Sequence, residues 1–358
     1  MIAERWLLFE PLDTVTVRDG RPFDAGQDSV ARTVLPSPTT MGGAVGAAYG
    51  ASPGAGLRAS ARGIEVPAQL MGPLVVNRHE RLLWPVPQDV VMEQDAAERA
   101  RHGISGHAPS PTRLRVESAP PGVVHDLPGM SGCLVGEGDP VDGWWETRAL
   151  GTYLAGGGPS SRIVWSPPWR TERRVGLAGD QDGRAMEGML YSTEHLRLDP
   201  GAGFGVRCLD GPGAALAPTV AFGGRGRGAQ VHTMATAPQL PAPAATAQDG
   251  RLLLYLATPA VFADGWRPDL SVWPGCELVA AATGEPQVIT TVTADRSTGG
   301  RRAGRLMWAV PAGSVYHLRF PGENQALAAA RSLEDRPLRQ AEEAFATVGF
   351  GWAFTGSW

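Results

Sequence analysis

Arginine side chains placed beside glycine-rich turns are the residues of this sequence best suited to chemistry. Arg18 and Arg21 flank an Asp-Gly turn, and Arg225 and Arg227 alternate with glycines in the segment 222–229. A guanidinium is a planar fork that binds a phosphate through two hydrogen bonds or stacks on a base. Glycines without a Cβ let backbone N–H groups approach the same phosphate. The pattern predicts an anion-binding surface, with a solvated turn between strands as the alternative.

A second basic group lies in residues 171–198, which read as a long β-hairpin around an Asp-Gly turn. Methionines just past a turn have adaptable apolar side chains that can wedge against a base. An amphipathic hairpin with a solvated basic face is the alternative. The candidate residues of this hairpin are Arg173, Arg174, Arg184, Met186 and Met189.

A helix start follows the first arginine-rich loop, and Arg32 lies just before it. Ser37 is placed as the N-cap and Pro38 occupies the first helical position. The unoccupied N–H groups near Thr39 and Thr40 suit a phosphate, and no acidic residue in the first turn competes with it. The sequence therefore predicts a second element of an anion cradle here.

Chemistry that needs lysine, a metal or a paired catalytic group finds no support in the sequence. All 32 basic residues are arginines, which excludes a Walker lysine or a Schiff-base lysine. The three cysteines are far apart and the seven histidines are scattered, so no metal site is expected. No glycine-rich loop precedes a helix as a dinucleotide fold requires, so no cofactor is expected either. The sequence itself shows no reaction.

Length and composition bound the class of protein. A chain of 358 residues with 43% hydrophobic residues predicts two domains. No apolar run approaches the roughly 20 residues of a membrane span, and the apolar run at residues 6–9 is too short for a signal peptide, so neither is expected. We expect a cytoplasmic protein with no membrane partner. Because the net charge is −4, any nucleic-acid surface must be local.

The elements that must position these residues are mostly strands. A first strand is expected over 5–17, interrupted at 10–13, and the region 238–248 reads as a low-complexity loop. Helices are expected from Ser37, over 93–101, and over 323–346 with a break near Pro337. Few helices per strand favour an α+β fold with antiparallel sheets. Further strands are expected around 64–76, 81–86, 171–178, 185–198, 203–209, 251–258, 276–281, 287–294 and 305–320.

An ordered series of motifs spans both ends and the middle of the chain. The series is RDGRPF, LPSPTTMGGAVGAA, ERRVGLAGDQDGRAMEGMLYSTEHLRL, AFGGRGRGA, TPAVFADGW, AVPAGSVYHL and GFGWAFTGSW. In this order the motifs resemble the third subunit of Cmr-type (type III-B) CRISPR effector complexes, in the RAMP superfamily. Two motifs depart from the family pattern. Arg225 stands where an acid is common, and the GGW element is reduced to Gly-Gly-Arg-Arg at 299–302.

The resemblance implies two ferredoxin-like (RRM/RAMP) domains with antiparallel sheets and glycine-rich loops. Residues 1–200 would form the N-terminal domain, with a hairpin thumb inserted near 171–198, and 201–358 the C-terminal domain. The subunit it implies is non-catalytic and serves antiviral defence. It binds and caps the 5′ tag of the CRISPR RNA, and it bridges the large polymerase/cyclase-like subunit to the adjacent backbone RAMP subunit.

A metal-independent endoribonuclease that matures CRISPR RNA is the alternative, because some RAMP proteins cleave RNA. The missing His/Tyr/Lys constellation counts against it. Carried over by motif, the RNA-facing candidates are Arg18, Arg21, Arg32, Ser37, Thr39, Thr40, Arg173, Arg174, Arg184, Met186, Met189, Gly223, Gly224, Arg225 and Arg227.

Overall fold

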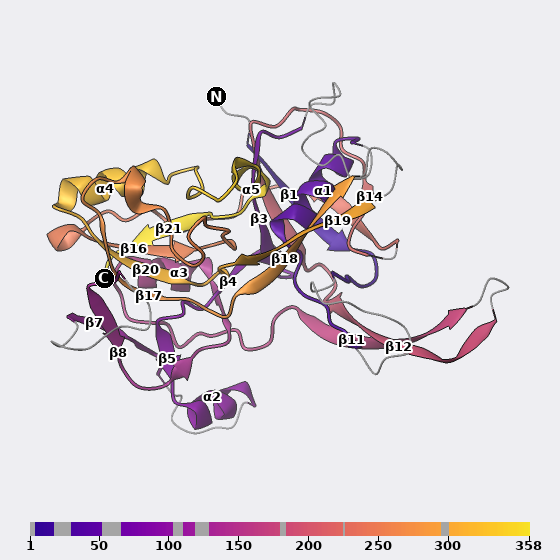
Figure 1. The fold of residues 1–358 in the computed structure, drawn as a ribbon, viewed down its shortest axis with the longest axis horizontal. Helices are drawn as coiled ribbons and strands as arrows, with labels where there is room; N and C mark the ends of the chain where they lie inside the picture. Colours follow the sequence, from indigo (N-terminus) through magenta and orange to yellow (C-terminus); the bar gives the residue numbers. More distant parts are fainter. Residues whose placement is uncertain are drawn as a thin grey trace. The chain divides into compact units, whose positions relative to one another are not determined.

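The chain forms two compact units that are interleaved along the sequence (Figure 1). The computed structural model describes residues 4–17, 30–51, 66–102, 110–118, 129–179, 184–224, 226–294 and 301–358. Unit 1 comprises Met1–Glu80, Pro168–Ala237 and Val288–Trp308, and unit 2 comprises Arg81–Pro167, Pro238–Gln287 and Ala309–Trp358. The division after residue 200 that the family resemblance implies stays a prediction.

Unit 1 contains five strands in the order β3-β13-β1-β15-β14, and each neighbouring pair is antiparallel. Apolar side chains of these strands pack together in one hydrophobic core. Phe9 of β1 pairs with Phe204 of β13 on one side and with Val231 of β15 on the other. The strands are β1 (Arg5–Pro11), β3 (Gln69–Val76), β13 (Gly203–Leu209), β14 (Thr219–Ala221) and β15 (Gly228–Thr233).

Helix α1 (Pro38–Ala48) packs against β3 and β14 of this unit. The expected start is confirmed, because the Ser37 side chain accepts a hydrogen bond from the N–H of Thr40. One face of the helix is apolar and buried, and Met41 and Val45 are fully enclosed by the core. The helix is therefore held by an N-cap at one end and by core packing along one side.

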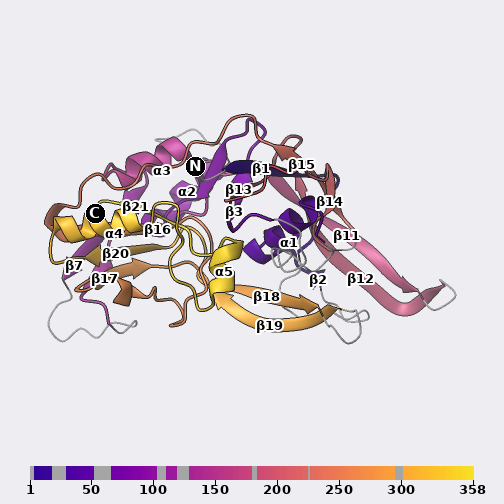
Figure 2. The same ribbon diagram turned by 90° about the horizontal axis from the view of Figure 1, so that it is seen from above.

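A long hairpin extends away from this sheet, as both ribbon views show (Figures 1 and 2). Strands β11 (Trp169–Gly179) and β12 (Ala185–Leu198) are antiparallel from Trp169↔Leu198 to Leu177↔Leu190, which confirms the predicted hairpin. Strand β2 (Val30–Ala31) pairs in parallel with β12. Strands β18 (Gln287–Ala294) and β19 (Arg301–Ala309) pair with each other in a separate two-stranded sheet.

Unit 2 contains a four-stranded sheet in the order β17-β20-β16-β21, with antiparallel neighbours throughout. Helix α4 packs against β16, and α3 packs against β21. The elements are α3 (Thr147–Leu154), β16 (Arg251–Leu256), β17 (Glu277–Ala282), β20 (Val315–Arg319), α4 (Glu323–Ser332), α5 (Glu343–Val348) and β21 (Ala353–Gly356).

Shorter elements complete unit 2. Strands β4 and β10 pair with each other, β5 lies between β6 and β9, and β7 pairs with β8. The helix expected over 93–101 is present as α2. Their bounds are β4 (Leu82–Pro85), β5 (Val90–Met92), α2 (Gln94–Arg101), β6 (Thr112–Arg113), β7 (Arg115–Ser118), β8 (Gly132–Val135), β9 (Asp139–Pro140), β10 (Trp144–Glu146), η2 (Gln248–Gly250) and η3 (Leu270–Val272).

The same strand order recurs in the two units. In unit 1, β1, β3, β13 and β15 follow one another along the chain, and in unit 2 the corresponding strands are β16, β17, β20 and β21. Across each sheet these strands lie in the order second, third, first, fourth. Helix α1 connects the first and second strands of unit 1, whereas α4 and α5 connect the third and fourth strands of unit 2.

The predicted α+β class with antiparallel sheets is confirmed, and one predicted strand was wrong. The segment 305–320 forms two strands, β19 and β20, because a turn at Pro311–Ser314 separates them and Gly313 there has φ +89°. The sequence also showed no sign of several short elements, among them β5 to β10, β14, β15, α3 and β21. Among the described residues, no helix is long and apolar enough to cross a membrane.

A buried polar cluster fixes the interior of unit 2. The Asp89 side chain is fully enclosed, and the Tyr153 hydroxyl donates to its Oδ1 at 2.6 Å. Arg113 Nε donates to Asp89 Oδ2 at 2.9 Å, and His317 Nε2 lies 3.4 Å from the same oxygen. The Arg113 guanidinium also lies 4.4 Å from the centre of the Tyr153 ring. Burial of this charge is balanced by a cation and two further polar partners.

Candidate functional site

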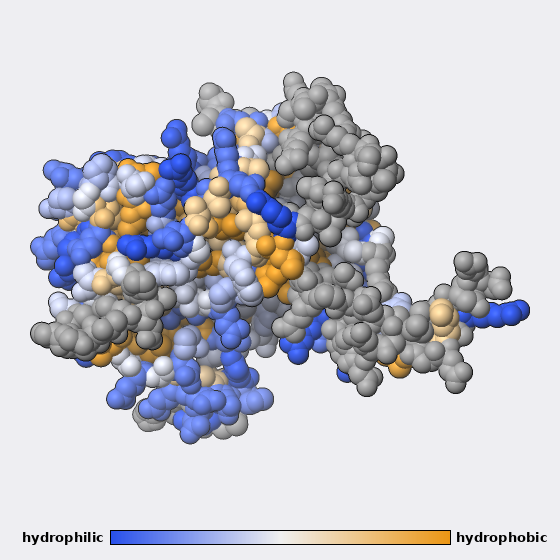
Figure 3. All heavy atoms as spheres, in the orientation of Figure 1, coloured by the Kyte–Doolittle hydropathy of each residue, from blue (hydrophilic) through white to orange (hydrophobic). Residues whose placement is uncertain are grey.

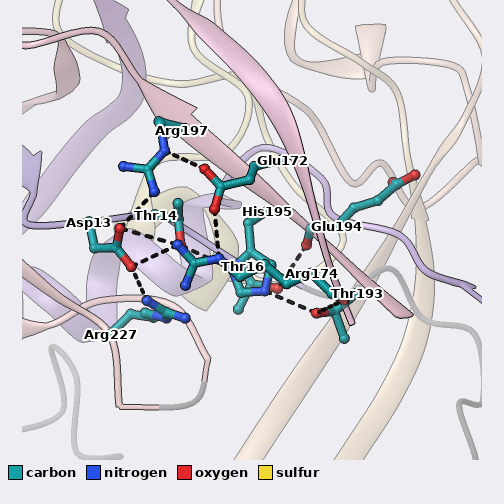
Figure 4. Close-up of polar contacts among 10 residues, drawn as sticks. All are labelled: Asp13, Thr14, Thr16, Glu172, Arg174, Thr193, Glu194, His195, Arg197 and Arg227. Atoms are coloured by element: carbon teal, nitrogen blue, oxygen red, sulfur yellow. Dashed lines mark hydrogen bonds and ion pairs between the residues drawn. The ribbon is translucent and has the colours of Figure 1, made fainter. Parts of the chain in front are cut away.

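Three arginines converge on one carboxylate at the base of the β11/β12 hairpin (Figure 4). Arg174 Nη2 lies 3.1 Å from Asp13 Oδ2, and Arg197 Nη2 lies 3.0 Å from Asp13 Oδ1. Arg227 Nη1 forms a short contact with Asp13 Oδ2. Asp13 follows the end of β1, whereas Arg227 immediately precedes β15. The cluster thus joins the hairpin to two loops of the sheet.

A second carboxylate orients two of these arginines from behind. Glu172 accepts a hydrogen bond from Arg174 Nε at 2.7 Å and a shorter one from Arg197 Nε. Glu172 and Arg174 share one face of β11, since they are two residues apart on a strand. The Nε edges of both guanidiniums are therefore occupied by Glu172, while their terminal nitrogens point to Asp13 (Figure 4).

Both carboxylates are held ionised by their neighbours. Hydrogen bonds from Arg197 and Arg174 lower the pKa of Glu172 to about 2. Burial acts to raise the pKa of Asp13, but the hydrogen bonds from Arg174 and Arg197 outweigh it and lower this pKa. Three guanidiniums and two carboxylates leave the cluster with one excess positive charge at neutral pH.

A buried histidine lies next to this cluster on the same face of β12. His195 is 2% exposed, and its Nδ1 lies 3.0 Å from the Thr14 hydroxyl. Its Nε2 lies 3.1 Å from the Thr193 hydroxyl, so both ring nitrogens have polar neighbours. Because the ring is enclosed and both nitrogens are engaged, this histidine positions the hairpin base against the segment after β1.

The glycine-rich loop between β14 and β15 closes on the same segment. Gly223 has φ +80°, and a Cβ there would lie 2.9 Å from the Thr16 carbonyl oxygen. The Gly224 N–H donates to that oxygen at 2.8 Å, and the Phe222 N–H donates to the carbonyl of Arg227 at 2.8 Å. Glycine is thus required for a close backbone approach. The Gly224 N–H is used within the protein.

The polar groups at the start of α1 form hydrogen bonds with one another. The Ser37 hydroxyl lies 2.7 Å from that of Thr39 and 3.2 Å from that of Thr40. The Thr40 N–H donates to Ser37 Oγ at 3.4 Å, and no acidic residue occupies the first turn. The predicted cap is confirmed, whereas a phosphate at this position stays a prediction.

The structure brings together only some of the RNA-facing candidates. Arg174 and Arg227 belong to the arginine cluster, whereas Arg173 faces the opposite side of β11, where its Nε donates to Ser192 Oγ at 2.6 Å. Arg32 is exposed. Arg18, Arg21 and Arg225 lie outside the described residues, as does the side chain of Met189.

The far end of the hairpin carries the two other candidates. Arg184 and Met186 are exposed there, and 42% of Met186 is accessible. Figure 3 shows strongly hydrophilic and hydrophobic spheres together in that part of the hairpin. Of the basic and apolar groups predicted for the hairpin, Arg184 and Met186 are thus at the surface.

Sequence reasoning missed Asp13, Glu172 and Arg197. The alternation of strand residues places Glu172, Arg174 and Arg197 on one hairpin face once the register is known. Asp13 is 159 residues from Glu172 in the numbering, so no local pattern links them. Among the described residues, no group of histidine, cysteine or acidic side chains could hold a metal ion.

An α+β fold with an arginine cluster beside a glycine-rich loop is the arrangement of a candidate nucleic-acid-binding protein. The family model for CRISPR-associated protein (Cas_Cmr3) matches residues 7–358. The chain therefore belongs to this family, and the resemblance to the third subunit of Cmr-type complexes is confirmed. A search of curated proteins found no match.

Two solved structures are similar over nearly the whole chain. One is the cryo-EM structure of the Type III-B Cmr-beta bound to cognate target RNA and AMPPnP, state 1, with 13% identity and a TM-score of 0.46. The other is the Type III-B Cmr-beta bound to cognate target RNA, with 13% identity and a TM-score of 0.45. Each match covers 97% of this chain and 95% of the other.

Proposed function

We propose that this chain is the non-catalytic subunit of a type III-B CRISPR effector complex that binds and caps the 5′ tag of the CRISPR RNA. It bridges the large polymerase/cyclase-like subunit to the adjacent backbone RAMP subunit and acts in the cytoplasm in antiviral defence. The observation that carries the proposal is the family match over residues 7–358. The surface chemistry of unit 1 supports it.

Each unit is proposed to be a ferredoxin-like domain of the RRM type. The strand order second, third, first, fourth with antiparallel neighbours, present in both units, supports this assignment. The β11/β12 hairpin, which precedes the third strand of unit 1, is proposed to be the inserted thumb. A sheet of this kind offers a platform for single-stranded RNA, with loops and hairpins that supply phosphate contacts.

Exposed arginines of unit 1 supply the charge that such a role needs. Arg32, Arg173 and Arg184 are all exposed, and a guanidinium both binds a phosphate and stacks on a splayed base. Because the chain carries a net charge of −4, binding must come from such local groups rather than from the overall field.

The test is RNA binding by the assembled complex and by the full chain at several salt concentrations. The triple variant Arg32→Ala, Arg173→Ala, Arg184→Ala should bind 5′-tag RNA more weakly. Its salt slope should be smaller by about two, because each phosphate contact to a single strand contributes about 0.7. Tag nucleotides should crosslink to the wild-type chain.

A control variant removes three exposed arginines of unit 2, Arg99, Arg331 and Arg336, and should bind as the wild type does. Equal losses in the two triple variants would refute a local site, and absence of any crosslink would leave only a protein-bridging role. Cleavage of a repeat-containing precursor RNA in EDTA, abolished by a histidine variant, would instead establish an endoribonuclease. His195 and His317 are 2% and 1% exposed, which disfavours both as bases.

A further inference from the structure

The side chains around Asp13 are those of an anion-binding site, and the Asp13 carboxylate occupies it. Terminal nitrogens of three guanidiniums approach its two oxygens, and Arg174 Nη2 reaches both, at 3.3 Å and 3.1 Å. Planar forks that converge on one negative group are the usual protein environment of a phosphate. The carboxylate now at the centre belongs to the protein itself.

Two of the three arginines are held by a side chain other than Asp13. Glu172 holds Arg174 and Arg197 through their Nε atoms, and this contact does not involve the nitrogens that face Asp13. Arg227 is fixed differently, because its backbone closes the glycine-rich loop through the Phe222 N–H. The three guanidiniums thus form a frame around Asp13 in which Glu172 orients Arg174 and Arg197, whereas the loop fixes only the backbone of Arg227.

Asp13 is the more accessible of the two carboxylates. Its side chain is 40% exposed against 30% for Glu172, and it lies in a bend after β1 rather than within a strand. A phosphodiester group carries one negative charge, as the Asp13 carboxylate does. Exchange of one for the other would preserve the charge at the centre of the frame.

We propose that Arg174, Arg197 and Arg227 form a binding site for a phosphate group of RNA, and that Asp13 occupies this site in the free protein as an internal competitor. The inference rests on the proposed function and deepens it by naming Arg197 as a ligand and Asp13 as the group that is displaced. Asp13 thereby reduces binding of unspecific anions, because only a ligand with additional contacts displaces it.

The experiment compares Asp13→Ala with the wild type, using three probes: inorganic phosphate, and a short single-stranded RNA with either a 5′-phosphate or a 5′-hydroxyl. Inorganic phosphate should raise the melting temperature of Asp13→Ala more than that of the wild type, because a ligand that binds only the folded state stabilises it. RNA should bind Asp13→Ala about tenfold more tightly, since one hydrogen bond to a charged group corresponds to about this factor.

The matched control is Glu194→Ala, which removes one negative charge from the same hairpin. Glu194 pairs with Arg173 across the strands and therefore lies on the face opposite to the arginine cluster. Adding Arg197→Ala to Asp13→Ala should abolish the gain. If Asp13→Ala unfolds, Asp13→Asn keeps the side-chain volume while removing the charge, and the same gain is expected.

An equal effect of Asp13→Ala and Glu194→Ala, or no gain in either Asp13 variant, would overturn the proposal. If inorganic phosphate stabilises Asp13→Ala but the protein binds neither RNA, the anion site is supported and the RNA-binding function is refuted. A gain restricted to the 5′-phosphorylated RNA would assign the site to the RNA end, and equal gains for both RNAs would assign it to the backbone.

Discussion

Removing the buried carboxylate of Asp89 should strongly destabilise unit 2, because it leaves the charge of Arg113 without a partner. Replacing it with asparagine removes the counter-charge of Arg113, whose side chain is only 17% exposed. The new amide would also point N–H groups at the Arg113 Nε–H, which now donates to Asp89 Oδ2 at 2.9 Å. Tyr153 could still donate to the remaining oxygen.

The size of the effect follows from this geometry. Removing one partner of a buried ion pair costs about 3–5 kcal/mol, because the other charge stays buried without compensation. For a domain of this size, each kcal/mol lowers the melting temperature by about 2–4 °C. We therefore expect Asp89→Asn to lower the melting temperature of unit 2 by about 6–20 °C.

Thermal and urea unfolding monitored by tryptophan fluorescence will measure the change. The matched control is Asp269→Asn, which breaks an exposed pair with Arg339 at 2.9 Å. Exposed pairs contribute less than about 1 kcal/mol. If the two variants lose similar stability, the reasoning about burial is refuted.

Three further predictions concern pH, backbone conformation and the first arginine-rich loop. Burial lowers the pKa of His317. Burial acts to raise the pKa of Asp89, but the hydrogen bond with His317, the charge of Arg113 and the Tyr153 hydroxyl outweigh it and lower this pKa. The unfolded chain therefore binds more protons than the folded one. The urea concentration at half-unfolding should decrease as the pH is lowered below about 6.5, and again as it is lowered below about 3.9. A half-unfolding concentration that does not change with pH would contradict this. Gly223→Ala should cost about 1–2 kcal/mol in urea unfolding, because φ is +80° there; unchanged stability would show that the loop adapts. The double variant Arg18→Ala, Arg21→Ala should bind the tag more weakly and with a smaller salt dependence, at an unchanged melting temperature. A lower melting temperature with unchanged RNA binding would show that the loop has a structural role.

Local sequence patterns determined much of the fold of this protein. Ser37 and Pro38 specify the start of α1, and the apolar spacing that follows specifies its buried face. The strand residues of 171–178 and 185–198 specify the β11/β12 pairing. These features depend on neighbours within a few residues, because caps and turns are made by short-range hydrogen bonds. The ordered motifs also sufficed to indicate the family.

Only the tertiary structure decided what the charged residues do. Arg174 and Arg227 were predicted to face RNA, yet both are bound to Asp13, which no local pattern connects to either of them. Asp89 likewise acquires its role from Arg113, Tyr153 and His317. Ion pairs form between whichever charges the sheet registers bring within a few ångströms, and their strength depends on burial. Neither quantity is encoded in residue type or spacing, so the sequence determined the elements and the folded chain determined the partners.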